Sequence, residues 1–127
     1  MPVTSPLQIL YVEDNEMVRE ITYELLCTDQ RKIVALGSAE EALEAFRAQP
    51  FDVLITDVSL PVMSGLDLVR NVLSMNPKLA VIIASGYSLD FGLEDWGPNV
   101  RAIIKPFESS EIDALIAQLT QDAAGRN

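Results

Sequence analysis

The chain has 127 residues, with 19 acidic and 9 basic side chains and no histidine, so its formal net charge is −10. This length suits one domain with its own core. The absence of histidine excludes Ser-His-Asp and Cys-His catalysis, an imidazole metal site and a histidine pH switch. The single Cys27 excludes a disulfide within the chain. The acidic balance argues against direct nucleic-acid binding, because phosphates are held by Lys and Arg.

No apolar run approaches the ~20 residues that span a bilayer, and residues 1–8 lack a signal-peptide pattern. We therefore expect a cytoplasmic protein without membrane insertion. The whole of 1–127 is interpreted as one domain, with a core over about 7–120 and flexible ends.

Five short apolar runs, rich in β-branched residues, predict strands that are buried on both faces of a parallel sheet. They occupy residues 9–12, 33–36, 53–56, 80–84 and 102–104. Apolar stripes at helical spacing predict helices over residues 17–26, 39–46, 66–73 and 112–119. This alternation predicts a three-layer, doubly wound α/β domain. The remaining helix is expected within 86–99, where glycines and Pro98 make it short or irregular.

Two local features sharpen this prediction. Ser38 precedes Glu41 at the spacing of a capping box, which places a helix start there. In the first helix we expect Met17, Val18 and Ile21 to face mostly the core, with part of the edge free for a partner.

Polar residues follow four of the five predicted strands. They are Glu13 and Asp14, Asp57, Ser85, and Lys105. Four of these five residues have an ordinary structural explanation: an N-cap for Asp14, turn residues for Asp57 and Ser85, and a solvated surface amine for Lys105. Together they are better explained as one site, because the carboxyl ends of parallel strands meet at the same sheet edge.

The residue types at this edge suggest a chemistry. Clustered carboxylates repel one another unless a cation lies among them, and hard oxygen ligands suit Mg²⁺ or Mn²⁺. A metal, a lysine and a hydroxyl together can stabilise a phosphoryl group, and a carboxylate can serve as its acceptor.

Four segments carry a resemblance to a known family. They are ILYVED at 9–14, DVSLPVMSG at 57–65, SG at 85–86 and KPF at 105–107. In this order and spacing, the chain resembles the receiver domain of two-component response regulators over about 7–119, most of all the receivers attached to hybrid sensor histidine kinases. The resemblance implies a flavodoxin-like strand order, 2-1-3-4-5.

The resemblance also implies roles for individual residues. Asp57 would accept the phosphoryl group. A Mg²⁺ or Mn²⁺ ion would be held by Glu13, Asp14, Asp57 and the backbone carbonyl of Ser59. Ser85 and Lys105 would contact the phosphoryl oxygens. The loops would be shaped by Pro61, Gly65 and Pro106, the last after a cis peptide bond.

The chain departs from the family pattern at two places. The acidic pair is Glu13-Asp14 in place of two aspartates, a variant that should still bind metal. The position three residues before Lys105, where the family has an aromatic switch residue, is Ala102. Tyr87, two residues after Ser85, is a candidate to supply a ring or to tune the lifetime of the phosphoaspartate.

The function implied is that of a phosphorelay receiver, which takes its phosphoryl group from a histidine kinase or a histidine phosphotransfer protein and turns over no substrate. A weak homodimer stays open, as does the choice between a free-standing receiver and a domain of a longer protein. One alternative is a receiver-fold binding module that acts without phosphorylation. Another is an enzyme of similar topology, either a flavodoxin, whose cofactor phosphate Glu13-Asp14 would repel, or a phosphatase, which needs an acid where Ser59 stands.

Overall fold

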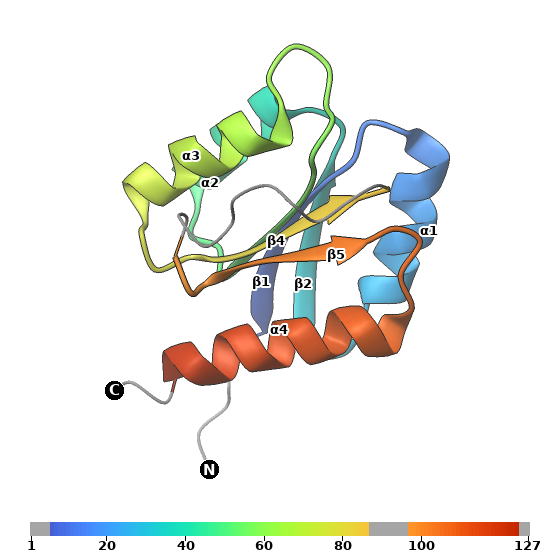
Figure 1. Cartoon of the computed structure of the whole chain (residues 1–127), viewed down its shortest axis with the longest axis vertical. Coiled ribbons are helices and arrows are strands. Elements are labelled where there is room, and N and C mark those ends of the chain that lie inside the picture. The colour runs from blue at the N-terminus through green and yellow to red at the C-terminus, as the bar shows by residue number, and fades with distance from the viewer. Residues whose placement is uncertain (1–5, 87–96, 125–127) are drawn as a thin grey trace.

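A five-stranded parallel sheet forms the centre of the protein (Figure 1). The computed structural model describes residues 6–86 and 97–124, with side chains as far as residue 120. The strand order is β2-β1-β3-β4-β5, which confirms the predicted doubly wound α/β fold. The strands are β1 (Leu7–Val12), β2 (Arg31–Leu36), β3 (Val53–Asp57), β4 (Ala80–Ser85) and β5 (Val100–Ile104).

Helices cover both faces of the sheet, with α2 and α3 on one face and α1 and α4 on the other (Figure 1). Their bounds are α1 (Glu16–Leu26), α2 (Ala39–Ala48), α3 (Gly65–Met75) and α4 (Ser109–Ala124). The short or irregular helix predicted within 86–99 lies mostly outside the described residues. None of the helices in the described ranges has both the length and the apolar character that a membrane span requires.

Side-chain caps fix where three of these helices begin. The Asn15 side chain accepts a hydrogen bond from the Val18 N–H at 3.0 Å. Ser38 accepts one from the Glu41 N–H at 3.1 Å, which confirms the predicted capping pair. Ser64 caps α3 in the same way. These oxygens satisfy backbone donors that a helix start otherwise leaves unpaired, so each helix leaves the site-bearing edge of the sheet at a defined residue.

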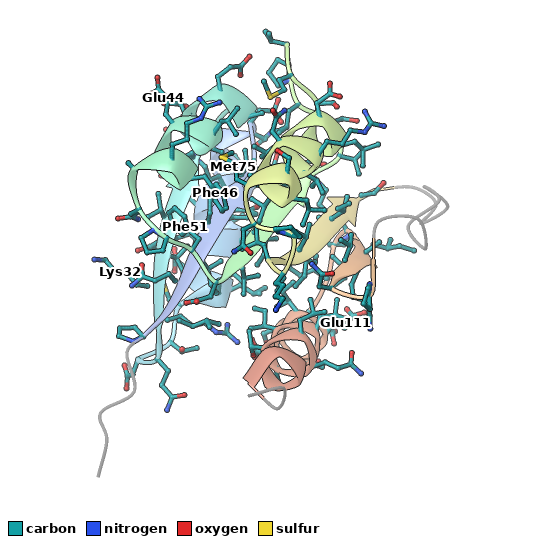
Figure 2. The ribbon with its side chains drawn as sticks, turned by 90° about the vertical axis from the view of Figure 1, so that its left-hand side faces the viewer. Lys32, Glu44, Phe46, Phe51, Met75 and Glu111 are labelled. Carbon is teal, nitrogen blue, oxygen red and sulfur yellow. The ribbon has the colours of Figure 1, made fainter. Side chains whose placement is uncertain are left out.

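Alternate residues of each strand enter two separate cores, which explains the unbroken apolar runs. In β1, Leu10 and Val12 pack toward α2 and α3, whereas Ile9 and Tyr11 pack toward α1 and α4. At about 25 cal/mol per Å² of buried apolar surface, two such layers supply the main driving force for folding. Phe46 and Phe51, labelled in Figure 2, are stacked with ring centroids 6.4 Å apart.

The first helix differs from the prediction on its apolar face. Met17 is 70% exposed and Ile21 is 60% exposed, so the expectation that they lie mostly in the core was wrong. The buried residues of α1 are Thr22 and Leu26. Residues 18, 22 and 26 form the line of α1 that faces the sheet. Residues 17 and 21 each precede a residue of that line, so they are rotated about 100° around the helix axis from it. One edge of the apolar stripe of α1 is therefore exposed to solvent.

Candidate functional site

Three carboxylates from two strand ends meet at the carboxyl edge of the sheet. Val12 pairs in register with Thr56, so the residues that follow, Glu13 and Asp57, emerge side by side. Oxygens of Glu13, Asp14 and Asp57 all lie within 4.8 Å of one another. Glu13 is buried, Asp57 is partly buried and Asp14 is exposed. The predicted convergence of these three acids is thus present in the structure.

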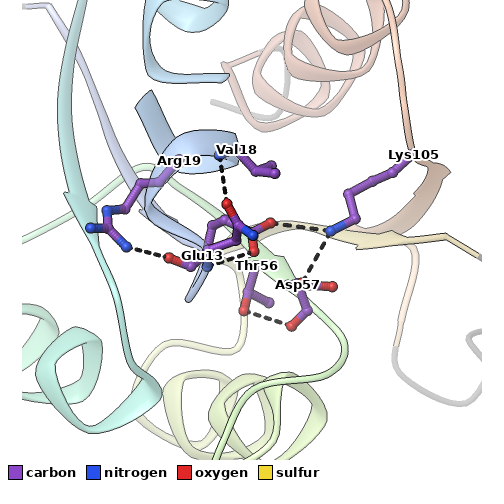
Figure 3. Close-up of polar contacts among 7 residues, drawn as sticks. Glu13, Val18, Arg19, Thr56, Asp57 and Lys105 are labelled. Carbon is purple, nitrogen blue, oxygen red and sulfur yellow. Dashed lines mark hydrogen bonds and ion pairs between the residues drawn. The ribbon is translucent and has the colours of Figure 1, made fainter. Parts of the chain in front are cut away.

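Lys105 bridges two of these acids from the end of β5 (Figure 3). Its Nζ lies 3.1 Å from Glu13 Oε1 and 3.1 Å from Asp57 Oδ2. The lysine side chain is 27% exposed, so it is not the solvated surface amine of the ordinary explanation. Burial alone lowers the pKa of Lys105, but hydrogen bonds to Asp57 and Glu13 outweigh burial and raise it. The lysine therefore stays charged beside the acids.

Glu13 is held by hydrogen bonds at every polar group. Its backbone N–H donates to the Leu36 carbonyl at 3.0 Å, and its carbonyl accepts from Arg19 Nη1 at 2.8 Å. Its Oε2 accepts from the backbone N–H of Asn15 at 3.1 Å. Because Asn15 caps α1, Asp14 is not the cap, and its carboxylate stays with the acidic cluster.

The backbone of Asp57 is fixed by the start of α3. The Thr56 hydroxyl donates to the Asp57 carbonyl at 3.0 Å, and the Gly65 N–H donates to the Val58 carbonyl at 2.9 Å. A Cβ at Gly65 would lie only 1.8 Å from the Asp57 carbonyl oxygen, so this position requires glycine. In the intervening loop, Val62 is 97% exposed and has φ of 69°, a left-handed conformation that β-branched residues rarely adopt.

The remaining predicted residues surround this cluster. Ser85 is buried at the end of β4, and its carbonyl accepts from the Lys105 N–H at 2.7 Å. The Lys105–Pro106 peptide bond is cis, as the resemblance implied. Ala102 is partly buried and pairs in register with Ile83. Ser59 and Pro61 lie in the exposed loop after β3, and Tyr87 lies outside the described residues.

The acidic cluster has the composition and size that a small divalent cation requires. Carboxylate oxygens are the hard ligands that Mg²⁺ prefers, and a magnesium site needs only a few of them because the ion keeps several waters. One oxygen from each of the three carboxylates lies within 4.8 Å of the other two, so the three side chains are close enough to serve as ligands of one ion. Exposed Asp14 leaves one side open to water or to a phosphoryl oxygen. The residues present fit Mg²⁺ or Mn²⁺.

Three residues near the cluster were not predicted as part of the site. Arg19 lies in α1 outside the apolar stripe, and Thr56 lies within a predicted strand. Tyr11, also in a strand, hydrogen-bonds the Thr22 side chain, and burial raises its pKa to about 12. The contacts of Arg19 and Tyr11 depend on how α1 packs on the sheet, and no local sequence pattern reports such packing.

The fold and this edge define a class: a doubly wound α/β domain with an acidic cluster and a lysine at the carboxyl end of its sheet. Residues 9–117 match the response regulator receiver domain, and the chain belongs to this family. It is a receiver domain of two-component signalling.

Individual relatives agree with this assignment. The chain is 34% identical to the sensor protein TorS of Escherichia coli strain K12 over 118 residues, which cover 91% of this chain and 13% of TorS. It resembles the receiver domain solved from Clostridium thermocellum, with a TM-score of 0.85, 25% identity and coverage of 95% of this chain and 99% of that one.

A further solved relative shares the fold and is described with a magnesium ion coordinated in its active-site cleft. It is the receiver domain of a sensor histidine kinase from Pseudomonas aeruginosa PAO1, with a TM-score of 0.79, 21% identity and coverage of 91% of this chain and 98% of that one. The chain spans about half or less of the length of curated relatives such as TorS and the regulator PhoP of Pseudomonas aeruginosa.

Proposed function

We propose that this receiver accepts a phosphoryl group from a partner phosphohistidine onto Asp57, in a reaction that depends on Mg²⁺ or Mn²⁺. The observation that carries the proposal is Lys105 Nζ lying 3.1 Å from both Glu13 and Asp57, within a cluster that Asp14 completes. This arrangement combines an acceptor carboxylate, a fixed positive charge and a set of metal ligands in one place.

The transfer follows from these groups. A carboxylate oxygen of Asp57 attacks phosphorus as the bond to the imidazole nitrogen breaks, which yields an acyl phosphate and releases the partner's histidine. Lys105 loses its ion pair with Asp57 Oδ2 and instead pairs with a phosphoryl oxygen. Glu13, Asp14, Asp57 and the Ser59 carbonyl would hold the metal ion, which would stabilise the charge on the phosphoryl oxygens when bound. The chain accepts a phosphoryl group on its own side chain and converts no other substrate, so it is not a turnover enzyme.

The conformational response is assigned to the ends of β4 and β5. We propose that the Ser85 hydroxyl turns toward the phosphoryl group. Ser85 lies at the end of β4, and its backbone carbonyl accepts a hydrogen bond from the Lys105 N–H. The new charge would shift a two-state equilibrium of this edge. Ala102 carries no ring to follow the hydroxyl, so the readout differs from that of a receiver with an aromatic residue there. We keep Tyr87 as the candidate ring.

The exposed edge of α1 suits the partner. Met17 and Ile21 are exposed apolar side chains one helical turn apart. Beside them, Ile21, Leu25, Lys105 and Phe107 line a groove of about 380 Å³, so it adjoins the phosphoryl site. We assign this surface to a histidine kinase or a histidine phosphotransfer protein, in the cytoplasm and without direct nucleic-acid contact.

The proposal is tested by incubating the protein with a small-molecule phosphodonor and following its intact mass. We expect the mass of one phosphoryl group to be added in the presence of Mg²⁺ and not in the presence of EDTA. Asp57→Ala should abolish the addition, whereas Asp52→Ala, on the exposed opposite edge, should not. A protein that gains no mass with Mg²⁺ acts as a phosphorylation-independent binding module instead.

A further inference from the structure

Glu13 is contacted by two cations from opposite sides, and only one of them touches its carboxylate (Figure 3). Lys105 reaches the side chain from β5. Arg19, the fourth residue of α1, places Nη1 2.8 Å from the Glu13 backbone carbonyl. Arg19 thus holds the main chain at the junction between β1 and α1, where the two consecutive acids of the cluster are anchored.

The space for this guanidinium is created by Gly37. A Cβ at Gly37 would lie 3.1 Å from Arg19 Nη1 and 3.7 Å from Arg19 Cζ, so the guanidinium lies directly over this glycine. The Glu41 Oε1 atom is 3.9 Å from the same point, which brings the first turn of α2 close to Arg19. The Arg19 side chain therefore links α1 to the backbone of Glu13 and passes over the residue that follows β2.

We propose that Arg19 is a positioning residue for the cation site: it fixes the Glu13–Asp14 backbone so that both carboxylates are held ready for the metal. The inference rests on the proposed metal site and names a residue that supports it without contacting the ion. Partners that hold metal ligands in place commonly contribute about 10–100-fold to metal affinity. Since Arg19 holds the backbone and not the carboxylate, we expect about 10-fold.

The sign of the effect separates positioning from charge. If Arg19 acted only as a positive charge near the site, its removal would make Mg²⁺ bind more tightly, because a cation repels a cation. If Arg19 positions the acids, its removal makes Mg²⁺ bind more weakly. The same reasoning gives the opposite sign for Lys105, whose removal frees two carboxylates.

The test is calorimetric titration of the full chain with Mg²⁺ alone. We expect Arg19→Met to raise the Kd for Mg²⁺ about 10-fold. Arg47→Met is the matched control, because it makes the same change in net charge on the exposed last turn of α2, far from the start of α2 near Arg19. This variant should leave the Kd for Mg²⁺ within about twofold of the wild-type value. Thermal unfolding in EDTA checks that each variant is folded.

Gly37→Ala gives an independent test in a variant that keeps Arg19. The added methyl group should displace the guanidinium and raise the Kd, but it should have no further effect when combined with Arg19→Met. An Arg19→Met protein that binds Mg²⁺ as tightly as the wild type, or more tightly, overturns the inference. So does a Gly37→Ala effect of equal size in both backgrounds. A wild-type protein that binds no Mg²⁺ overturns the metal site itself.

Discussion

Gly65 is the first residue of α3 and packs directly against the end of β3. A Cβ at this position would lie 1.8 Å from the Asp57 carbonyl oxygen, 2.9 Å from the Asp57 carbonyl carbon and 3.2 Å from Thr56 Oγ1. Two of these atoms belong to the backbone, which cannot turn away as a flexible side chain can. Gly65→Ala therefore forces the helix and the strand apart.

The size of the effect follows from these distances. Carbon and oxygen atoms normally approach to about 3.3–3.6 Å, so the start of α3 must retreat by about 1.5 Å. Overpacking of this kind costs about 1–3 kcal/mol, and loss of the hydrogen bond from Gly65 to Val58 adds about 1 kcal/mol. The higher helix propensity of alanine offsets at most about 1 kcal/mol of this loss. We expect Gly65→Ala to lower the free energy of unfolding by about 2–3 kcal/mol.

Urea denaturation followed by circular dichroism measures this loss. With a slope of about 1–3 kcal/mol per molar urea, the unfolding midpoint should fall by about 0.7–3 M. Gly86→Ala is the matched control, because no atom lies within 4 Å of a Cβ at Gly86. A Gly65→Ala protein that unfolds at the wild-type urea concentration or above would refute the proposed close packing.

Three further predictions follow from the site and its loop. Val62→Asn should stabilise the protein against urea by about 1 kcal/mol, because asparagine tolerates the φ of 69° better than valine; a less stable variant contradicts the strain. Lys105→Met should lower the free energy of unfolding in EDTA by about 1–2 kcal/mol, a value between those for exposed and buried ion pairs. The same variant should lower the Kd for Mg²⁺, because Glu13 and Asp57 lose the lysine that neutralises them, and weaker Mg²⁺ binding would contradict this reasoning. Burial raises the pKa of Tyr11 from 10.0 to about 12, so its stabilising contribution is complete below pH 10 and is lost as the pH rises toward 12. Tyr11→Phe should therefore flatten the fall in urea stability over this range, and an unchanged slope argues against a buried neutral phenol.

The parts of the protein that could be predicted from sequence are those that depend on local residue patterns. Continuous β-branched runs define strands that are buried on both faces, and the residue after each run lands at one edge by the geometry of parallel pairing. For this reason Glu13, Asp57 and Lys105 could be brought together from the sequence before any distance was known. The Ser38–Glu41 cap was equally local.

Contacts that depend on how helices pack could not be predicted in this way. Helical periodicity identifies an apolar stripe but not how far a helix rotates on the sheet, so the exposure of Met17 and Ile21 was missed. Arg19 has the spacing of an ordinary surface residue, and its role depends on the missing side chain of Gly37. The need for glycine at Gly65 is likewise set by the path of the chain around Asp57.

The central claim is that Asp57 is the phosphoacceptor, and locating the phosphoryl group on the chain tests it most directly. The protein is phosphorylated with a small-molecule donor and Mg²⁺, the acyl phosphate is trapped by borohydride reduction, and the peptides are sequenced by mass spectrometry. Reduction converts the modified aspartate to homoserine, which marks its position. We predict the mark at Asp57 alone and its loss when EDTA replaces Mg²⁺. A mark at Glu13, Asp14 or another acid, or no mark with Mg²⁺, would contradict the account.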